Sequence, residues 1–215
     1  MSATHGPTWA LRAHAASEWV LWVVTINALW WVFTLAGLGL FGAAPATFAA
    51  AELTRRQLRG ERTRPVREFA SAWRREFLRA NALLGPFLVA AALLIGNVLA
   101  LGPGPLRVAA IAAGALVTIV VHALVPLYAC YDLRLGSYVP TAMRWAARNL
   151  AHVLVLLAVS ALIVGASAAV PGLIPFVSMG AIVVANAALG SAFFAANERA
   201  LAERTSPTSS LPHHP

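Results

Sequence analysis

The sequence predicts an all-α fold in the form of a polytopic helical membrane bundle. Hydrophobic residues make up 60% of the 215 residues and charged residues only 11%, which is not the balance of a soluble globular surface. The charges also cluster, and long stretches such as Leu83 to Gly104 carry none. We therefore expect a single helical membrane domain over residues 18–204.

The first apolar segment, Glu18 to Leu38, has roughly 20 residues, which at about 1.5 Å per residue cross a hydrocarbon core about 30 Å thick. Residues 1–17 precede it as an N-terminal segment expected at the interface, with Trp19 and Trp22 as boundary residues. The apolar run is longer than the core of a secretory signal peptide. We interpret it as a retained span.

Four later segments are clear spans: Asn81–Leu101, Leu106–Tyr131, Asn149–Val170 and Pro175–Asn197. The connections between them differ in charge. Two are short, uncharged and rich in Gly and Pro, whereas residues 132–148 carry three arginines. By the positive-inside rule, the uncharged turns lie outside, and the arginine-bearing connections and the C-terminus lie in the cytoplasm.

The segment after the first span permits two topologies. Gly42 and Pro45 mark a turn, with Pro45 suited to a first helical turn, and the apolar part of residues 45–59 is short for a full crossing. If this segment returns across the membrane, six helices form three hairpins and the N-terminus is inside. If it lies on the surface, five helices span and the N-terminus is outside. A Gly/Pro turn at every outer end favours six helices, with five as the alternative.

Two segments are expected to lie in the membrane surface as amphipathic helices. In residues 66–81, Phe69, Trp73 and Phe77 recur every four residues, opposite several arginines. Residues 139–149 show a weaker pattern of the same kind. The arginine-rich segment 55–80 is expected in the cytoplasm, and residues 205–215 are expected to form a disordered tail.

The net charge of +8 predicts an anionic partner. Nine of the sixteen arginines fall within residues 55–79, beside apolar spans, which favours lipid head groups or a membrane partner and argues against nucleic acid. The residues assigned to this partner or lipid-head-group surface are Arg55, Arg56, Arg59, Phe69, Trp73, Arg74, Arg75 and Phe77.

Polar residues within the spans are candidates for an intramembrane site, because burying them in lipid is costly. They are Asn27, Glu52, Asn97, His122 and Asn186. For these residues a role in holding the fold together is favoured over a functional role: Glu52 is expected to pair with Arg55 or Arg56, and the asparagines to form interhelical hydrogen bonds. At a helix end, Asp132 is likewise expected to pair with Arg134. Pro126, one turn after His122, is expected to kink its helix or free a carbonyl group.

No cofactor or metal is expected. Cys130 is the single cysteine, and nothing in the sequence brings His122 and His152 together as ligands. The sequence contains no Walker A loop, no Gly-x-Ser-x-Gly, no His-Glu-x-x-His and no dinucleotide fingerprint, which argues against an enzyme.

Several short stretches of the sequence are similar to those of a known family. They are Asn27 to Trp30, Gly42, Pro45 to Thr47 with Ala50, Arg59 to Glu61, Phe69, and Glu76 to Asn81. Together they resemble the YesL-like bacterial integral membrane proteins, which carry domain of unknown function 624. The resemblance implies a compact multipass protein of the plasma membrane, whose relatives often have sugar ABC transporters as gene neighbours. It implies no catalytic residues.

Two functions follow as expectations. The first is a non-enzymatic accessory protein that binds a membrane partner, such as a sugar ABC transporter. The second is a small transporter or channel with a path lined by Asn27, Asn97, His122 and Asn186.

Overall fold

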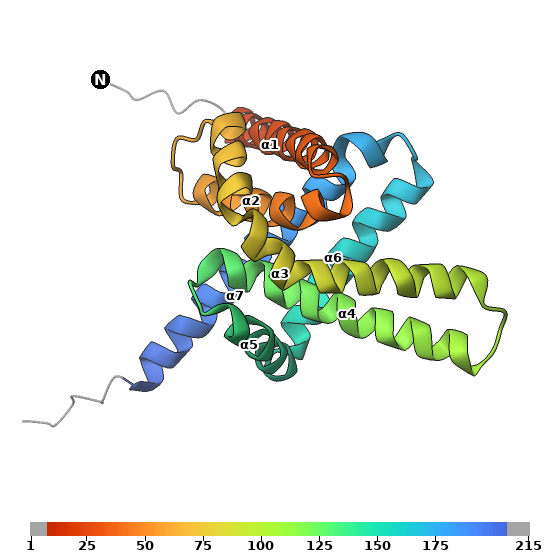
Figure 1. Cartoon of the computed structure of the whole chain (residues 1–215). Helices are drawn as coiled ribbons and strands as arrows, with labels where there is room; N and C mark the ends of the chain where they lie inside the picture. Colours follow the sequence, from red (N-terminus) through yellow and green to blue (C-terminus); the bar gives the residue numbers. More distant parts are fainter. Residues whose placement is uncertain (1–7, 206–215) are drawn as a thin grey trace, which may run out of the picture.

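The computed structural model describes residues 8–205, and the regular elements of this part of the chain are all helices. The elements are α1 (Thr8–Ala36), α2 (Leu40–Leu58), α3 (Pro65–Ala100), α4 (Pro105–Cys130), α5 (Leu135–Arg148), α6 (Leu150–Ala169), the π-helical turn η1 (Ile174–Ser178) and α7 (Met179–Thr205) (Figure 1). The predicted all-α class is confirmed.

Three helical hairpins organise the chain: α1–α2, α3–α4 and α6–α7. In Figure 1 the α3–α4 turn lies far to the right, and the α2–α3 and α4–α5 connections lie to the left. Five helices are long and apolar enough to cross a membrane, namely Arg12–Ala36, Pro65–Ala100, Pro105–Cys130, Leu150–Ala169 and Ile174–Arg199. Helix α2 is not among them, so length and composition agree with the five-span alternative. The three hairpins, by contrast, have the arrangement expected of the six-helix topology.

Helix α2 lies at the centre of the fold, packed against α1, α3, α4 and α7. Its alanines at positions 44, 46, 49, 50 and 51 are completely buried. Small side chains let helices approach closely in membrane proteins. The approach is closest at Gly42, where an added Cβ would lie 2.4 Å from the carbonyl oxygen of Thr34. Glycine at this position is therefore required by the packing of α1 on α2.

Pro45 was expected in the first helical turn, but it lies further along the helix because α2 already begins at Leu40. A proline within a helix has no N–H to donate to the carbonyl group four residues earlier. Here that carbonyl belongs to Phe41, and the side-chain Nδ2 of Asn81 donates to it at 2.8 Å. Helix α3 thus supplies the hydrogen bond that α2 cannot make for itself.

Three segment boundaries differ from expectation. Helix α1 begins at Thr8, so residues 8–17 continue directly into the first span, while residues 1–7 lie outside the described part. The expected surface helix 66–81 is continuous with the next span in α3. Of the expected tail, Thr205 ends α7 and residues 206–215 are not described. By contrast, α5 is a separate helix, close to the expected residues 139–149.

The aromatic face of α3 packs on the α1–α2 hairpin, which corrects its assignment to a lipid-head-group surface. Phe69 is fully buried, with its ring centroid 5.1 Å from that of Phe33. Trp73 lies 4.9 Å from Phe77 by the same measure, and its Nε1 donates to the carbonyl oxygen of Gly42 at 3.3 Å. An apolar face repeating every four residues fits a protein groove as well as a lipid interface.

We predict that Asn81→Leu lowers the free energy of unfolding by about 1–2 kcal/mol, because the Phe41 carbonyl then has no donor. In a Pro45→Ala background the loss should be smaller by about 1 kcal/mol, since the new N–H can reach that carbonyl. Unfolding by SDS titration in mixed micelles measures both values. Asn97→Leu is the control, because Asn97 is exposed and bonds to Leu93 of its own helix. Equal losses in the two backgrounds would contradict this role of Asn81.

Candidate functional site

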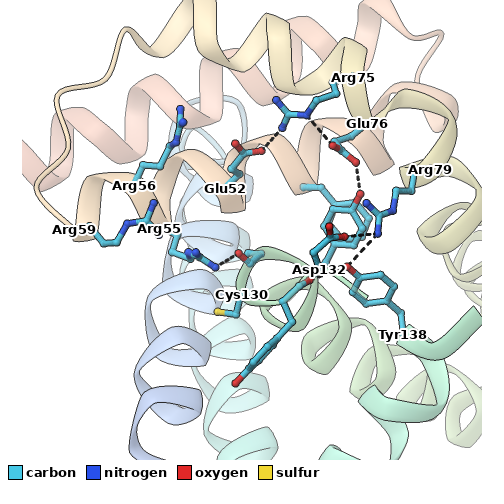
Figure 2. Close-up of a pocket in the computed structure, with 14 residues that line it drawn as sticks. Glu52, Arg55, Arg56, Arg59, Arg75, Glu76, Arg79, Cys130, Asp132 and Tyr138 are labelled. Atoms are coloured by element: carbon cyan, nitrogen blue, oxygen red, sulfur yellow. Dashed lines mark hydrogen bonds and ion pairs between the residues drawn. The ribbon is translucent and has the colours of Figure 1, made fainter. Parts of the chain in front are cut away.

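A polar cavity of about 370 Å³ lies where the C-terminal ends of α2 and α4 meet α3 and α5 (Figure 2). Five arginines and three carboxylates line it, together with aromatic side chains. The lining residues are Phe48, Glu52, Arg55, Arg56 and Arg59 from α2, Arg75, Glu76 and Arg79 from α3, and Tyr128, Ala129, Cys130, Tyr131, Asp132 and Tyr138 from α4, α5 and their connection.

One side of this cavity is a chain of charged and hydroxyl groups. Arg75 donates to Glu52 at 2.7 Å and to Glu76 at 2.9 Å. Glu76 also accepts a hydrogen bond from the hydroxyl of Tyr128, whose ring stacks on Phe48 with centroids 3.9 Å apart. The chain therefore connects α2, α3 and α4, as the dashed lines in Figure 2 show.

The prediction that Glu52 pairs with Arg55 or Arg56 of its own helix is wrong, since its partner is Arg75 of α3. The two nearby arginines have other partners. Arg55 donates to the carbonyl oxygen of Ala129 at the end of α4. Arg56 pairs with Glu68 at 3.0 Å. Each guanidinium thus reaches a group on a different element.

Arg79 connects α3 to the α4–α5 connection. Its Nη2 lies 2.9 Å from the Asp132 carboxylate, 2.7 Å from the carbonyl oxygen of Leu133 and 3.4 Å from the Tyr138 hydroxyl. Its guanidinium carbon lies 5.3 Å and 5.6 Å from the ring centroids of Tyr128 and Tyr138. Arg79, and not Arg134 as predicted, is therefore the partner of Asp132.

Two tyrosine hydroxyls stay protonated at this site. Burial raises the pKa of Tyr131, and so does its hydrogen bond to the Glu198 carboxylate. Burial also raises the pKa of Tyr138, although the backbone N–H of Leu133 donates to that hydroxyl and opposes the shift. A neutral Tyr138 can donate to the carbonyl oxygen of Tyr131, 2.8 Å away. These hydroxyls therefore act as hydrogen-bond donors.

The polar residues expected inside the membrane do not come together. Asn27 is fully buried and joins α1 to the start of α7: its Nδ2 donates to the carbonyl oxygen of Pro175 at 2.6 Å, and its Oδ1 accepts from Gly180 at 2.9 Å. Asn186 is buried, with no recorded partner for its Oδ1 within the described chain. Asn97 is exposed near the end of α3. Three of the four proposed path residues are thus buried, and the fourth lies on the surface.

His122 makes one hydrogen bond within its own helix and one to a neighbouring helix. Its Nδ1 lies 2.8 Å from the carbonyl oxygen of Thr118, and its Nε2 lies 2.8 Å from Ser160 Oγ on α6. Since a carbonyl oxygen only accepts, Nδ1 carries the proton and Nε2 accepts from the serine. His152 packs instead on Phe193, with ring centroids 4.4 Å apart. Pro126 packs against Gly190 of α7, where an added Cβ would lie 2.2 Å from the proline Cβ.

Ion pairs between arginines and carboxylates dominate this site. Its carboxylates are engaged by Arg75 and Arg79. Among the side chains that the structure describes, no group of three His, Cys, Asp or Glu residues could hold a metal ion. The sequence alone did not assign Glu76, Arg79, Tyr128 or Tyr138 to a site. These residues lie on three different helices far from α2 in the sequence, so no spacing within one segment could have grouped them.

Comparison with known proteins gives relatives for most of the chain. The family model "Protein of unknown function, DUF624" matches residues 23–98. In Bacillus subtilis (strain 168), uncharacterized protein YteU is 33% identical over 169 residues, which cover 75% of this chain and 76% of YteU. Uncharacterized protein YesV is 30% identical over 170 residues, which cover 76% of this chain and 82% of YesV. A shorter match joins the chain to YesL, with 38% identity over 82 residues, which cover 36% of this chain and 37% of YesL. No solved structure matches significantly.

We predict that Arg79→Ala lowers the free energy of unfolding by about 1–3 kcal/mol, because the Leu133 carbonyl and the Tyr138 hydroxyl lose their charged donor. Asp132→Asn should change it by less than about 0.5 kcal/mol, since the Asp132 side chain is 90% exposed and exposed ion pairs contribute little. SDS titration compares the two variants, with Arg74→Ala as an exposed control. Equal effects of Arg79→Ala and Asp132→Asn would show that the ion pair alone matters.

Proposed function

Since the chain belongs to the DUF624 family, whose description assigns no activity, we propose its function from its own surface: a non-enzymatic accessory membrane protein that binds a membrane partner in association with carbohydrate uptake. Five apolar helices indicate a membrane protein. The bacterial plasma membrane is the proposed location, and a sugar ABC transporter is the proposed partner.

The observation that carries the proposal is a group of four exposed arginines. Arg62, Arg64, Arg67 and Arg74 lie on the α2–α3 connection and the first turns of α3, and we call them the docking arginines. Among the described residues, none of the four has a carboxylate within ion-pair distance. Exposed guanidinium groups without an internal partner can bind carboxylates on another protein.

The orientation follows from the arginine-bearing connections. The docking arginines follow the C-terminal end of α2, and that end meets the end of α4 through the Arg55–Ala129 hydrogen bond. The Tyr131–Glu198 hydrogen bond brings the last turns of α7 to the same place. By the positive-inside rule this end of the bundle, with the C-terminus, is cytoplasmic. The docking arginines then face the cytoplasmic parts of a transporter.

The association with carbohydrate uptake has separate support, from the resemblance to YesL-like proteins and the sugar transporters that accompany them in gene neighbourhoods. A transport path through the chain itself has less support. Asn97 is exposed, and Asn27 and His122 use their polar atoms in bonds that hold helices together.

We predict that the tagged full chain, purified in mild detergent, recovers a transporter subunit. Replacing all four docking arginines by Gln should reduce recovery at least about tenfold, because four charge-assisted contacts are lost. The matched control replaces the same four by Lys, which keeps the charge and should retain most of the binding. Recovery should also fall as salt is raised. Repeated recovery of the wild-type chain alone would refute the partner role.

We also predict that a reporter fused at Gly60 or after the last residue is found in the cytoplasm. A reporter fused ahead of α1 decides between the topologies, since only a membrane-crossing α2 places the N-terminus inside. The measurement is a pair of reporters, one active only outside and one active only inside. An external signal at Gly60 would overturn the orientation and, with it, access of the docking arginines to the cytoplasm.

A further inference from the structure

A second cavity, of about 420 Å³, adjoins the polar cavity and shares part of its wall. Arg55, Arg59, Cys130 and Tyr131 line both. From this shared wall the second cavity extends between the end of α2 and α7, where its apolar lining is Leu58 of α2 with Phe194 and Ala195 of α7. Ser191 and Glu198 of α7 also line it. The two cavities therefore offer a charged region and an apolar region side by side.

Arg55 is the arginine at this junction that has no acidic partner among the described residues. Arg75 and Arg79 pair with the three carboxylates of the polar cavity, and Arg56 and Arg59 pair with Glu61. The half-buried Arg55 guanidinium has one recorded hydrogen bond within the described chain, to the carbonyl oxygen of Ala129. A guanidinium carries five N–H donors, so most of its capacity is unused.

We propose that Arg55 binds a phosphate group at the junction of the two cavities. The planar guanidinium matches two phosphate oxygens with two parallel hydrogen bonds. The other four arginines of the polar cavity pair with carboxylates, whereas the charge of Arg55 has no carboxylate partner among the described residues, which favours an anion beside it. The Glu198 carboxylate repels a phosphate from the far part of the second cavity and leaves Arg55 as its position.

The source of the phosphate is an anionic phospholipid or a soluble phosphate ester. The second cavity favours the lipid, because its apolar wall suits the glycerol and acyl part of a lipid whose phosphate lies on Arg55. The junction also lies at the ends of α2 and α4, where apolar helices give way to charged connections, as at the head-group level of a bilayer. This site is distinct from the docking arginines and does not depend on the partner proposal.

The test uses the full chain in neutral detergent, mixed with equal amounts of phosphatidylglycerol and phosphatidylcholine, and counts bound lipid by native mass spectrometry. We expect the wild-type chain to retain phosphatidylglycerol about tenfold or more over phosphatidylcholine, as one charge-assisted contact allows. Arg55→Gln should abolish this preference, because it removes the charge while its amide can still donate to Ala129. Arg148→Gln makes the same charge change at an exposed residue outside both cavities and should leave the preference intact.

A second arm titrates glycerol phosphate into the lipid-free chain and follows it by phosphorus NMR. If the wild-type chain shows no lipid preference but binds glycerol phosphate, and Arg55→Gln removes that binding, the phosphate site is supported and its ligand is a soluble phosphate ester. Arg55→Lys, which keeps a cation, should restore part of the binding in either arm. The wild-type chain alone can overturn the proposal: absence of both the lipid preference and glycerol phosphate binding does so, whatever the variants show. An equal loss in Arg148→Gln and Arg55→Gln overturns it too.

Discussion

The burial of α2 among α1, α3, α4 and α7 is the constraint from which much of the rest follows. The buried backbone groups of such a helix must have their hydrogen-bond partners supplied by protein. Alanine and glycine along α2 let the neighbours approach closely enough to do so. Pro45 leaves the Phe41 carbonyl without its usual donor, and Asn81 supplies one. Helix α3 is thereby held against α2 by a specific contact as well as by packing.

The same enclosure explains why charges pair between helices at the end of α2. Glu52, Arg55 and Arg56 lie close together in the C-terminal part of α2, yet their partners lie on α3 and α4. Partly exposed ion pairs contribute roughly 0–1 kcal/mol each, so they orient the ends of the helices more than they stabilise them. Burial of aromatic side chains such as Phe69 and stacking of Phe48 on Tyr128 contribute more to stability. The polar cavity is thus a consequence of packing that the ion pairs then fix in shape.

Hydropathy and Gly/Pro turns were sufficient to predict the helical class and the hairpins, because both are properties of local sequence. The site needed information that local sequence does not hold. The four-residue repeat of Phe69, Trp73 and Phe77 is compatible with lipid or protein, and the neighbouring groove that decides between them comes from α1 and α2. Similarly, the spacing of Glu52 and Arg55 permits a pair within one helix, whereas Arg75 lies 23 residues away in the sequence. A proline within a helix predicts a carbonyl in need of a donor, but only the tertiary structure identifies Asn81.

The arginine-rich segment is therefore not one functional unit, although its sequence reads as one run of positive charge. Arg75 and Arg79 neutralise internal carboxylates and hold α3 to its neighbours. The docking arginines are exposed and have no ion-pair partner within the described part of the chain, and Arg55 lines a cavity. Positive-inside topology needs only the total charge, and any arginine serves it equally. Binding depends on position, because a guanidinium already committed to a carboxylate has little affinity left for another anion. Within residues 55–79, the arginines that have no carboxylate partner among the described residues are Arg55, which lines a cavity, and the docking arginines, which are exposed on the α2–α3 connection and α3.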